Sequence, residues 1–134
     1  MKPAVLLNIL PRSVSWFTLI GALAALVHYV IAVIMEGGFN VAPAWANLTG
    51  FLFAFPVSYI GHRKFSFAQH TSSHQHAFPR FLLVACGGFF ANQALLLGLL
   101  RLLGLPFWLT LGIVMVVVAV STYVLSRHWA FKSL

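Results

Sequence analysis

Two short segments of similar composition hold three of the eight Lys and Arg residues in this 134-residue chain. They are Tyr-Ile-Gly-His-Arg-Lys-Phe-Ser-Phe at residues 59–67 and Tyr-Val-Leu-Ser-Arg-His-Trp-Ala-Phe at residues 123–131. Both contain Tyr, three residues, Arg, one residue, an aromatic residue, one residue and Phe. Arginine presents a fork of N–H donors to anions. Basic and aromatic residues also anchor helix ends at membrane interfaces. Anion binding and anchoring both remain open interpretations.

Polar residues occur inside the long apolar stretches. At the 64-residue offset that aligns the two segments, His28 matches Asn92, and Gln93 lies beside Asn92. Polar side chains at such depth in a membrane face other helices rather than lipid. Two interpretations remain open: interhelical hydrogen bonds, worth on the order of 1 kcal/mol, or the lining of a path for a polar substrate. Asn47 begins a glycosylation sequon, which we set aside because it lies inside an apolar stretch.

Acidic groups and catalytic patterns are scarce. Glu36 is the only carboxylate residue and is expected to be solvated in a loop or paired with Arg101. Three histidines of residues 68–80 lack a nearby Cys or carboxylate residue, so a solvated loop is favoured over a metal site. No nucleophile–base pattern, glycine-rich phosphate loop or acidic pair is visible. The sequence predicts a protein that is not an enzyme and has no cofactor.

The composition determines which elements position these residues. Apolar residues make up 61% of the chain and charged residues 7%, with a mean hydropathy of +0.97. Soluble domains contain about 25% charged residues, so a soluble enzyme is excluded, and the hydrophobicity excludes disorder. The net charge of +7 is scattered between apolar runs. This pattern favours a membrane protein without a nucleic-acid partner.

Four apolar stretches, at about 14–35, 43–61, 81–100 and 106–125, are long enough to span a bilayer as helices. Breakers or basic residues flank each one, such as Pro11-Arg12 and Pro79-Arg80. Small residues along the first and third stretches predict close helix contacts: Gly21, Ala22, Ala24, Ala25, Ala85, Gly87, Gly88 and Ala91.

The distribution of basic residues predicts the orientation. Seven of them fall on one side of the four stretches, and Arg101 alone falls on the other. The positive-inside rule places both termini and the central loop in the cytoplasm. We expect an all-α, multi-pass membrane protein with a single transmembrane domain over residues 1–134. It would contain two parallel helical-hairpin repeats, about 14–67 and 78–131, joined by a cytoplasmic loop at 68–77.

The chain resembles the GtrA-like family of small four-span bacterial membrane proteins. The resemblance rests on Arg63-Lys64-Phe65-Ser66-Phe67, on Arg127-His128-Trp129-Ala130-Phe131 and on the helix-opening Phe81-Leu-Leu-Val, and it covers about residues 14–133. The family often has Asn before the basic pair, where this chain has His62 and Ser126.

The resemblance implies translocation of a polyprenyl-phosphate-linked sugar across the bacterial inner membrane for cell-surface polysaccharide synthesis or modification. The chain's own chemistry then suggests three sets of residues. The candidates for binding the lipid phosphate are Arg63, Lys64, Arg127 and His128. The candidates for the sugar path are His28, Asn92, Gln93, Tyr59 and Tyr123. The interface aromatics are Phe65, Phe67, Trp129 and Phe131, of which Trp129 could stack on a sugar.

The expected partners are membrane lipids, the lipid-linked sugar and a second copy of the chain, because four short helices barely enclose a sugar headgroup. One alternative function is a non-transporting adaptor that recruits or stabilises a polyprenyl-phosphate glycosyltransferase. A small multidrug-type exporter is disfavoured, because no apolar stretch contains the acidic residue that proton-coupled export of cations requires.

Overall fold

The computed structural model describes residues 3–66 and 74–125, with side chains for 15–64 and 78–121. Four α-helices follow one another: α1 (Pro3–Val33), α2 (Pro43–Gly61), α3 (His74–Leu103) and α4 (Phe107–Leu125). Short π-helical turns, η1 (Ile34–Gly38) and η2 (His62–Ser66), extend α1 and α2. No strand occurs in the described ranges. The prediction of an all-helical chain is therefore confirmed.

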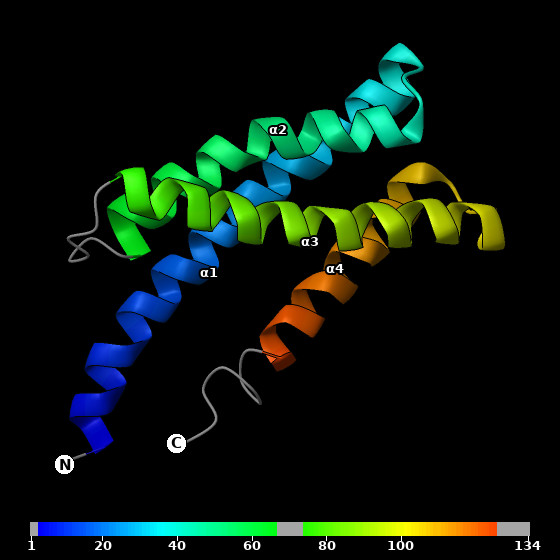
Figure 1. The fold of residues 1–134 in the computed structure, drawn as a ribbon. Coiled ribbons are helices and arrows are strands. Elements are labelled where there is room, and N and C mark those ends of the chain that lie inside the picture. The colour runs from blue at the N-terminus through cyan, green and yellow to red at the C-terminus, as the bar shows by residue number, and fades with distance from the viewer. Residues whose placement is uncertain (1–2, 67–73, 126–134) are drawn as a thin grey trace.

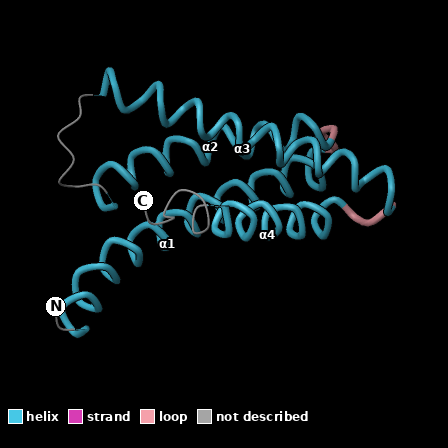
Figure 2. Tube along the Cα trace, turned by 60° about the horizontal axis from the view of Figure 1, so that its bottom comes forward, coloured by secondary structure: helices cyan, strands magenta, loops and turns pink. Residues whose placement is uncertain are grey.

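The helices form two hairpins (Figure 1). In the first, α2 runs back along α1. In the second, α4 diverges from α3 beyond the turn that joins them. The start of α1, the end of α2, the start of α3 and the end of α4 lie towards one side, and both hairpin turns lie towards the other (Figures 1 and 2). We call the first side the basic end, since Arg63, Lys64 and Arg80 lie there, and the second the turn end.

Each hairpin turn contains one residue in the left-handed backbone region. Asn40 has φ 56° in the first turn and Gly104 has φ 63° in the second. Asparagine and glycine adopt this conformation more readily than other residues. The first turn is also closed by a hydrogen bond of 3.0 Å from the Val41 N–H to the Met35 carbonyl.

Two helices start earlier than their flanking prolines suggested. α1 begins at Pro3 and runs through Pro11, and α3 begins at His74 and contains Pro79. α3 therefore overlaps the end of the predicted loop at 68–77. Pro79 is the sixth residue of α3, so its missing N–H removes one backbone hydrogen bond near the start of a 30-residue helix.

Two glycines of α2 lie against α1 with no room for a side chain. A Cβ atom at Gly50 would lie 2.5 Å from the carbonyl oxygen of His28, and one at Gly61 would lie 2.7 Å from Cγ2 of Ile20. The predicted close contact of small residues is wrong for Gly21 on the first stretch and for Gly87 and Gly88 on the third, because no atom lies within 4 Å of a Cβ built on any of them. Composition marks small residues but does not show which face of a helix packs.

The packed core lies in the turn-end half of the molecule. Its buried members come from all four helices: Ala32, Ala46, Leu96, Phe107, Leu111 and Val114. Leu96, Leu111 and Val114 are completely buried. All four described helices therefore meet in one core near their two hairpin turns.

The outer surface is strongly apolar. Leu83 and Val84 are each 75% exposed, and Leu102 is 80% exposed. Two described helical segments are long and apolar enough to cross a membrane, Ser15–Gly38 and Phe78–Leu103, while the apolar segment Phe107–Ser121 is shorter. An exposed apolar surface of this kind is typical of contact with lipid or with another protein.

Candidate functional site

A cavity of about 220 Å³ lies among the four helices. Its lining is mainly small and aromatic, and includes Ala24, Ala85 and Phe55. Among the residues that the structure describes, its polar lining residues are His28, Ser58 and Asn92, and none of its lining residues is Lys, Arg, Asp or Glu. The cavity occupies the middle of the helices and the part of α2 and α3 nearer the basic end. The packed core lies on its other side, towards the turns.

Asn47 on α2 links three helices at the polar boundary of this cavity. Its side chain is 0% exposed. Its Nδ2 donates to Asn92 Oδ1 at 2.7 Å and to Gln93 Oε1 at 2.8 Å, both on α3. Its Oδ1 lies 2.7 Å from Nε2 of His28 on α1. Gln93 Nε2 completes the cluster by donating to the Ala44 carbonyl at 3.0 Å. We call these four side chains the Asn47 network.

Three of the side chains predicted for the sugar path thus meet in one place. His28 and Asn92 line the cavity, whereas Gln93 binds behind them to the backbone of α2. Interhelical hydrogen bonding is present, and two members of the network also face the cavity. The two interpretations made from sequence are therefore compatible.

Sequence analysis missed Asn47, which it considered only as part of a sequon. The signal was the one that singled out His28, namely a polar side chain well inside an apolar stretch. Applied to Asn47, the same argument predicts a residue that faces other helices.

Tyr59 belongs to a different layer, closer to the basic end. It is largely buried, with its ring centroid 5.2 Å from Phe78, 5.5 Å from Phe81 and 6.3 Å from Phe55. It does not line the cavity. The structure therefore separates Tyr59 from the other described members of the predicted sugar path. This aromatic layer joins α2 to α3 between the Asn47 network and the basic end.

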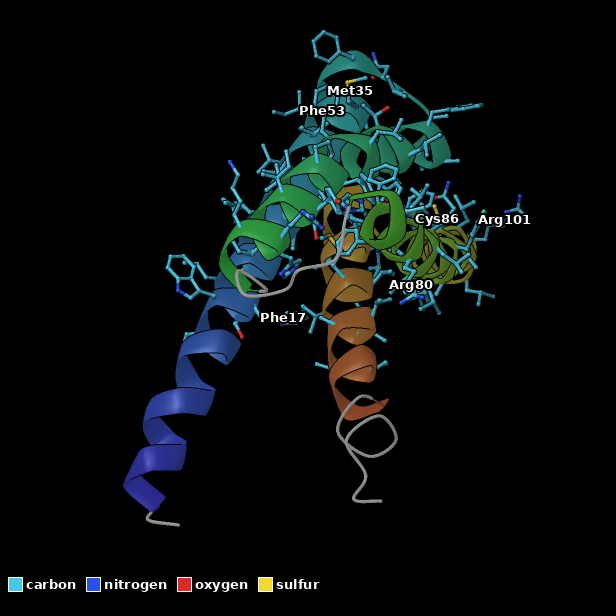
Figure 3. The ribbon with its side chains drawn as sticks, turned by 60° about the vertical axis from the view of Figure 1, so that its left-hand side comes forward. Phe17, Met35, Phe53, Arg80, Cys86 and Arg101 are labelled. Atoms are coloured by element: carbon cyan, nitrogen blue, oxygen red, sulfur yellow. The ribbon has the colours of Figure 1, made fainter. Side chains whose placement is uncertain are left out.

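His62 lies one turn further towards the basic end. Its ring is buried against Phe17, with a centroid distance of 4.7 Å. Burial lowers the pKa of His62, because an apolar environment disfavours the charged imidazolium. Figure 3 shows Phe17 low on α1 and Met35 near its turn.

The described cations of the predicted phosphate site lie next to this layer. Arg63 is half-buried and Lys64 is exposed, both in η2. Arg80 is exposed near the start of α3, and Arg101 extends into the surroundings near the other end of that helix (Figure 3).

Several predicted residues lie outside the described residues: Phe67, Arg127, His128, Trp129 and Phe131. The side chains of Phe65 and Tyr123 are likewise not described, although their backbones belong to η2 and α4.

Comparison with known proteins identifies the family. The family described as "GtrA/DPMS, transmembrane domain" matches residues 16–131, nearly the whole chain. No curated protein and no solved structure matches. The matched region contains both hairpins, the cavity and the Asn47 network, and its transmembrane description agrees with the apolar outer surface. The chain is therefore a membrane protein that belongs to the GtrA/DPMS transmembrane domain family.

Proposed function

We propose that this protein translocates a polyprenyl-phosphate-linked sugar across the bacterial inner membrane, for synthesis or modification of a cell-surface polysaccharide. The observation that carries the proposal is the Asn47 network at the boundary of a cavity among four apolar helices. Buried polar side chains inside membrane helices commonly mark substrate pathways. Family membership supports a role with this class of lipid.

We further propose that all four helices cross the membrane as two parallel hairpin repeats. α2, with 19 residues, would extend over roughly 28 Å, close to the ~30 Å of a bilayer's hydrocarbon core. Arg63, Lys64 and Arg80 lie at the basic end, against Arg101 towards the turn end. The positive-inside rule then places the basic end in the cytoplasm.

In this arrangement the headgroup enters from the cytoplasmic side. Arg63 and Lys64, with Arg127 and His128 of the second basic segment, bind the phosphate. The aromatic residues beside them lie at the interface, and the prenyl tail remains in the surrounding lipid. The protein contributes no chemical step, so movement follows the gradient of the lipid-linked sugar.

We propose that the working unit is a homodimer. The cavity of about 220 Å³ is smaller than the ~300–1,000 Å³ of typical small-molecule pockets. A second copy beside the cavity would provide the remaining enclosure for the headgroup. Crosslinking in native-like lipid is expected to give dimers, and a result of monomers alone would contradict this proposal.

Translocation can be tested in proteoliposomes that contain only this protein and a short-chain polyprenyl-phosphate sugar. Wild type should move the sugar lipid, and the double variant Arg63→Ala/Arg127→Ala should lose that activity. Movement that survives in the variant would reduce both arginines to membrane anchors. No movement with several lipid-linked sugars would contradict the proposed function.

The second candidate is an adaptor for a membrane glycosyltransferase. It is favoured by the extent of hydrogen bonding, since a network that joins helices this closely can serve a purely structural role. Asn92→Leu together with Gln93→Leu separates the two candidates. A translocator should lose transport even where the protein remains folded, whereas an adaptor should still support its glycosyltransferase.

A further inference from the structure

We infer that Asn92 and His28 together bind one hydroxyl group of the sugar, and that Asn47 is the positioning residue that determines which of their atoms face the cavity. The identity of the lipid rests on the proposed function. The assignment of donor and acceptor atoms, which we call the polarity of the site, rests on the hydrogen-bond geometry of the network.

The Ala44 carbonyl oxygen is a partner of the network whose hydrogen-bond role is fixed. A backbone carbonyl oxygen only accepts hydrogen bonds. The Gln93 atom 3.0 Å from the Ala44 carbonyl must therefore be the amide nitrogen, Nε2. This fixes the orientation of the Gln93 amide, which directs Oε1 towards Asn47 at 2.8 Å.

The orientation of Gln93 then fixes that of Asn47. Because Gln93 Oε1 accepts, the Asn47 atom facing it must be Nδ2, which also donates to Asn92 Oδ1 at 2.7 Å. Both hydrogens of that amide are then used. Asn47 Oδ1 remains as an acceptor 2.7 Å from His28 Nε2, so Nε2 carries the proton of the neutral imidazole.

Two polar groups are left over, and both belong to residues that line the cavity. Asn92 has its Nδ2 group, with two hydrogens to donate, and neutral His28 has the lone pair of Nδ1. Neither atom has a hydrogen-bond partner among the described residues. In the described part of the chain, every side-chain nitrogen or oxygen that is buried has a hydrogen-bond partner. Because these two atoms have no partner, they are not buried. We assign the accessible space that they reach to the cavity.

A donor and an acceptor on two residues that line one cavity match a hydroxyl group. A sugar hydroxyl can accept from Asn92 Nδ2 and donate to His28 Nδ1 at the same time. The ionised phosphodiester of such a lipid offers only acceptors and would oppose the lone pair of Nδ1, and an ammonium group offers only donors. None of the described side chains that line this cavity is Lys, Arg, Asp or Glu. The sugar thus lies against the Asn47 network, and the phosphate lies towards the basic end.

The test varies the ligand and the protein together. Binding is measured in nanodiscs for three kinds of short-chain lipid. They are sugar-free polyprenyl phosphate, polyprenyl phosphate linked to a hexose, and polyprenyl phosphate linked to each monodeoxy version of that hexose. Wild type should bind one monodeoxy version about ten-fold more weakly than the full sugar, as expected for loss of a paired hydroxyl. Asn92→Leu should bind both about equally weakly, while its affinity for sugar-free polyprenyl phosphate stays the same.

Thr49→Ala is the matched control. Its hydroxyl donates to the Trp45 carbonyl within α2 at 2.8 Å and does not line the cavity. The control should retain the wild-type difference between the full and the deoxy sugar. Two results would overturn the inference: equal losses of sugar-linked and sugar-free lipid in Asn92→Leu, or no monodeoxy hexose that binds more weakly than the full sugar to wild type.

A second measurement determines the protonation of His28 in the wild-type protein itself. Nitrogen NMR of the histidines in the wild-type protein, assigned by comparison with His28→Gln, should show His28 protonated at Nε2 and unprotonated at Nδ1. Bound hexose lipid should shift the Nδ1 resonance, and sugar-free lipid should not. The opposite tautomer would overturn the polarity of the site even if transport is observed. Failure of every lipid to bind would instead reject the proposed function and, with it, the sugar as ligand.

Discussion

The carbonyl oxygen of His28 and the Cα of Gly50 lie against each other where α1 crosses α2. A Cβ atom at Gly50 would come within 2.5 Å of that oxygen and 2.7 Å of His28 Cδ2. The glycine thus allows α2 to approach the part of α1 that holds the His28 ring next to Asn47. The close helix contact and the polar network are therefore two parts of one arrangement.

Gly50→Ala should destabilise the protein. The new methyl group would meet backbone and an imidazole ring rather than a flexible side chain, and such overpacking costs about 1–3 kcal/mol. Thermal unfolding in detergent should show a lower midpoint than wild type. Gly21→Ala is the control, because nothing lies within 4 Å of a Cβ at that position. Equal midpoints for Gly50→Ala and Gly21→Ala would show that α1 and α2 are not in this close contact.

Asn47→Leu should also destabilise the protein, by loss of polar pairing. The leucine would remove the hydrogen-bond partners of His28 and Asn92 and one of those of Gln93. Interhelical hydrogen bonds in membranes are worth about 0.6–2 kcal/mol each. Loss of the three bonds of Asn47 should therefore lower the free energy of unfolding by about 1–3 kcal/mol. Unfolding by a denaturing detergent measures the change, with Thr49→Val as the control. A stability equal to wild type would show that the network contributes nothing to the fold.

Protonation of His62 should weaken the fold in mild acid. Burial holds the pKa of His62 below its ordinary value of 6.5, so the unfolded chain takes up a proton at a higher pH than the folded chain. Stability from this group is complete above pH 6.5, falls as the pH drops below that value and stops falling below the folded-state pKa. The thermal midpoint of wild type should therefore decrease between neutral pH and pH 5.

His62→Phe tests the origin of that decrease. A phenyl ring keeps the aromatic contact with Phe17 but cannot titrate, so the decrease of the midpoint towards acid should be smaller than in wild type. The other histidines are present in both proteins, so the difference between the two curves isolates His62. Identical pH profiles would show that this ring does not change its proton affinity on folding.

Much of the fold was predictable because long apolar runs without alternation leave helices as the only regular structure. The polar residues His28, Asn92 and Gln93 were predictable as a group, because burying each of them in lipid is costly. Their common partner, Asn47, was not recognised. Its role depends on α2 crossing both α1 and α3 at one level, and that is a property of three-dimensional packing.

Helix ends and contact faces were harder to predict. Prolines suggested helix starts near Pro11 and Pro79, yet both helices begin before them. Small residues suggested contacts at Gly87 and Gly88, whereas the close approaches are at Gly50 and Gly61. The sequence shows where a glycine is, but not whether it lies on a lipid-facing or a packed face of its helix. Only the position of the neighbouring helix distinguishes the two faces.

The cavity itself can be tested by filling it. Ala85 on α3 lines the cavity and is half-buried, so Ala85→Phe should extend a ring into space that the headgroup needs. Translocation and hexose-lipid binding should both fall by about ten-fold or more, because a ligand that no longer fits loses its buried contacts. Thermal stability should change little, since the ring enters an existing void. Ala91→Phe is the control, because Ala91 is exposed and does not line the cavity. Unchanged transport in Ala85→Phe, with binding intact, would place the path of the sugar outside this cavity.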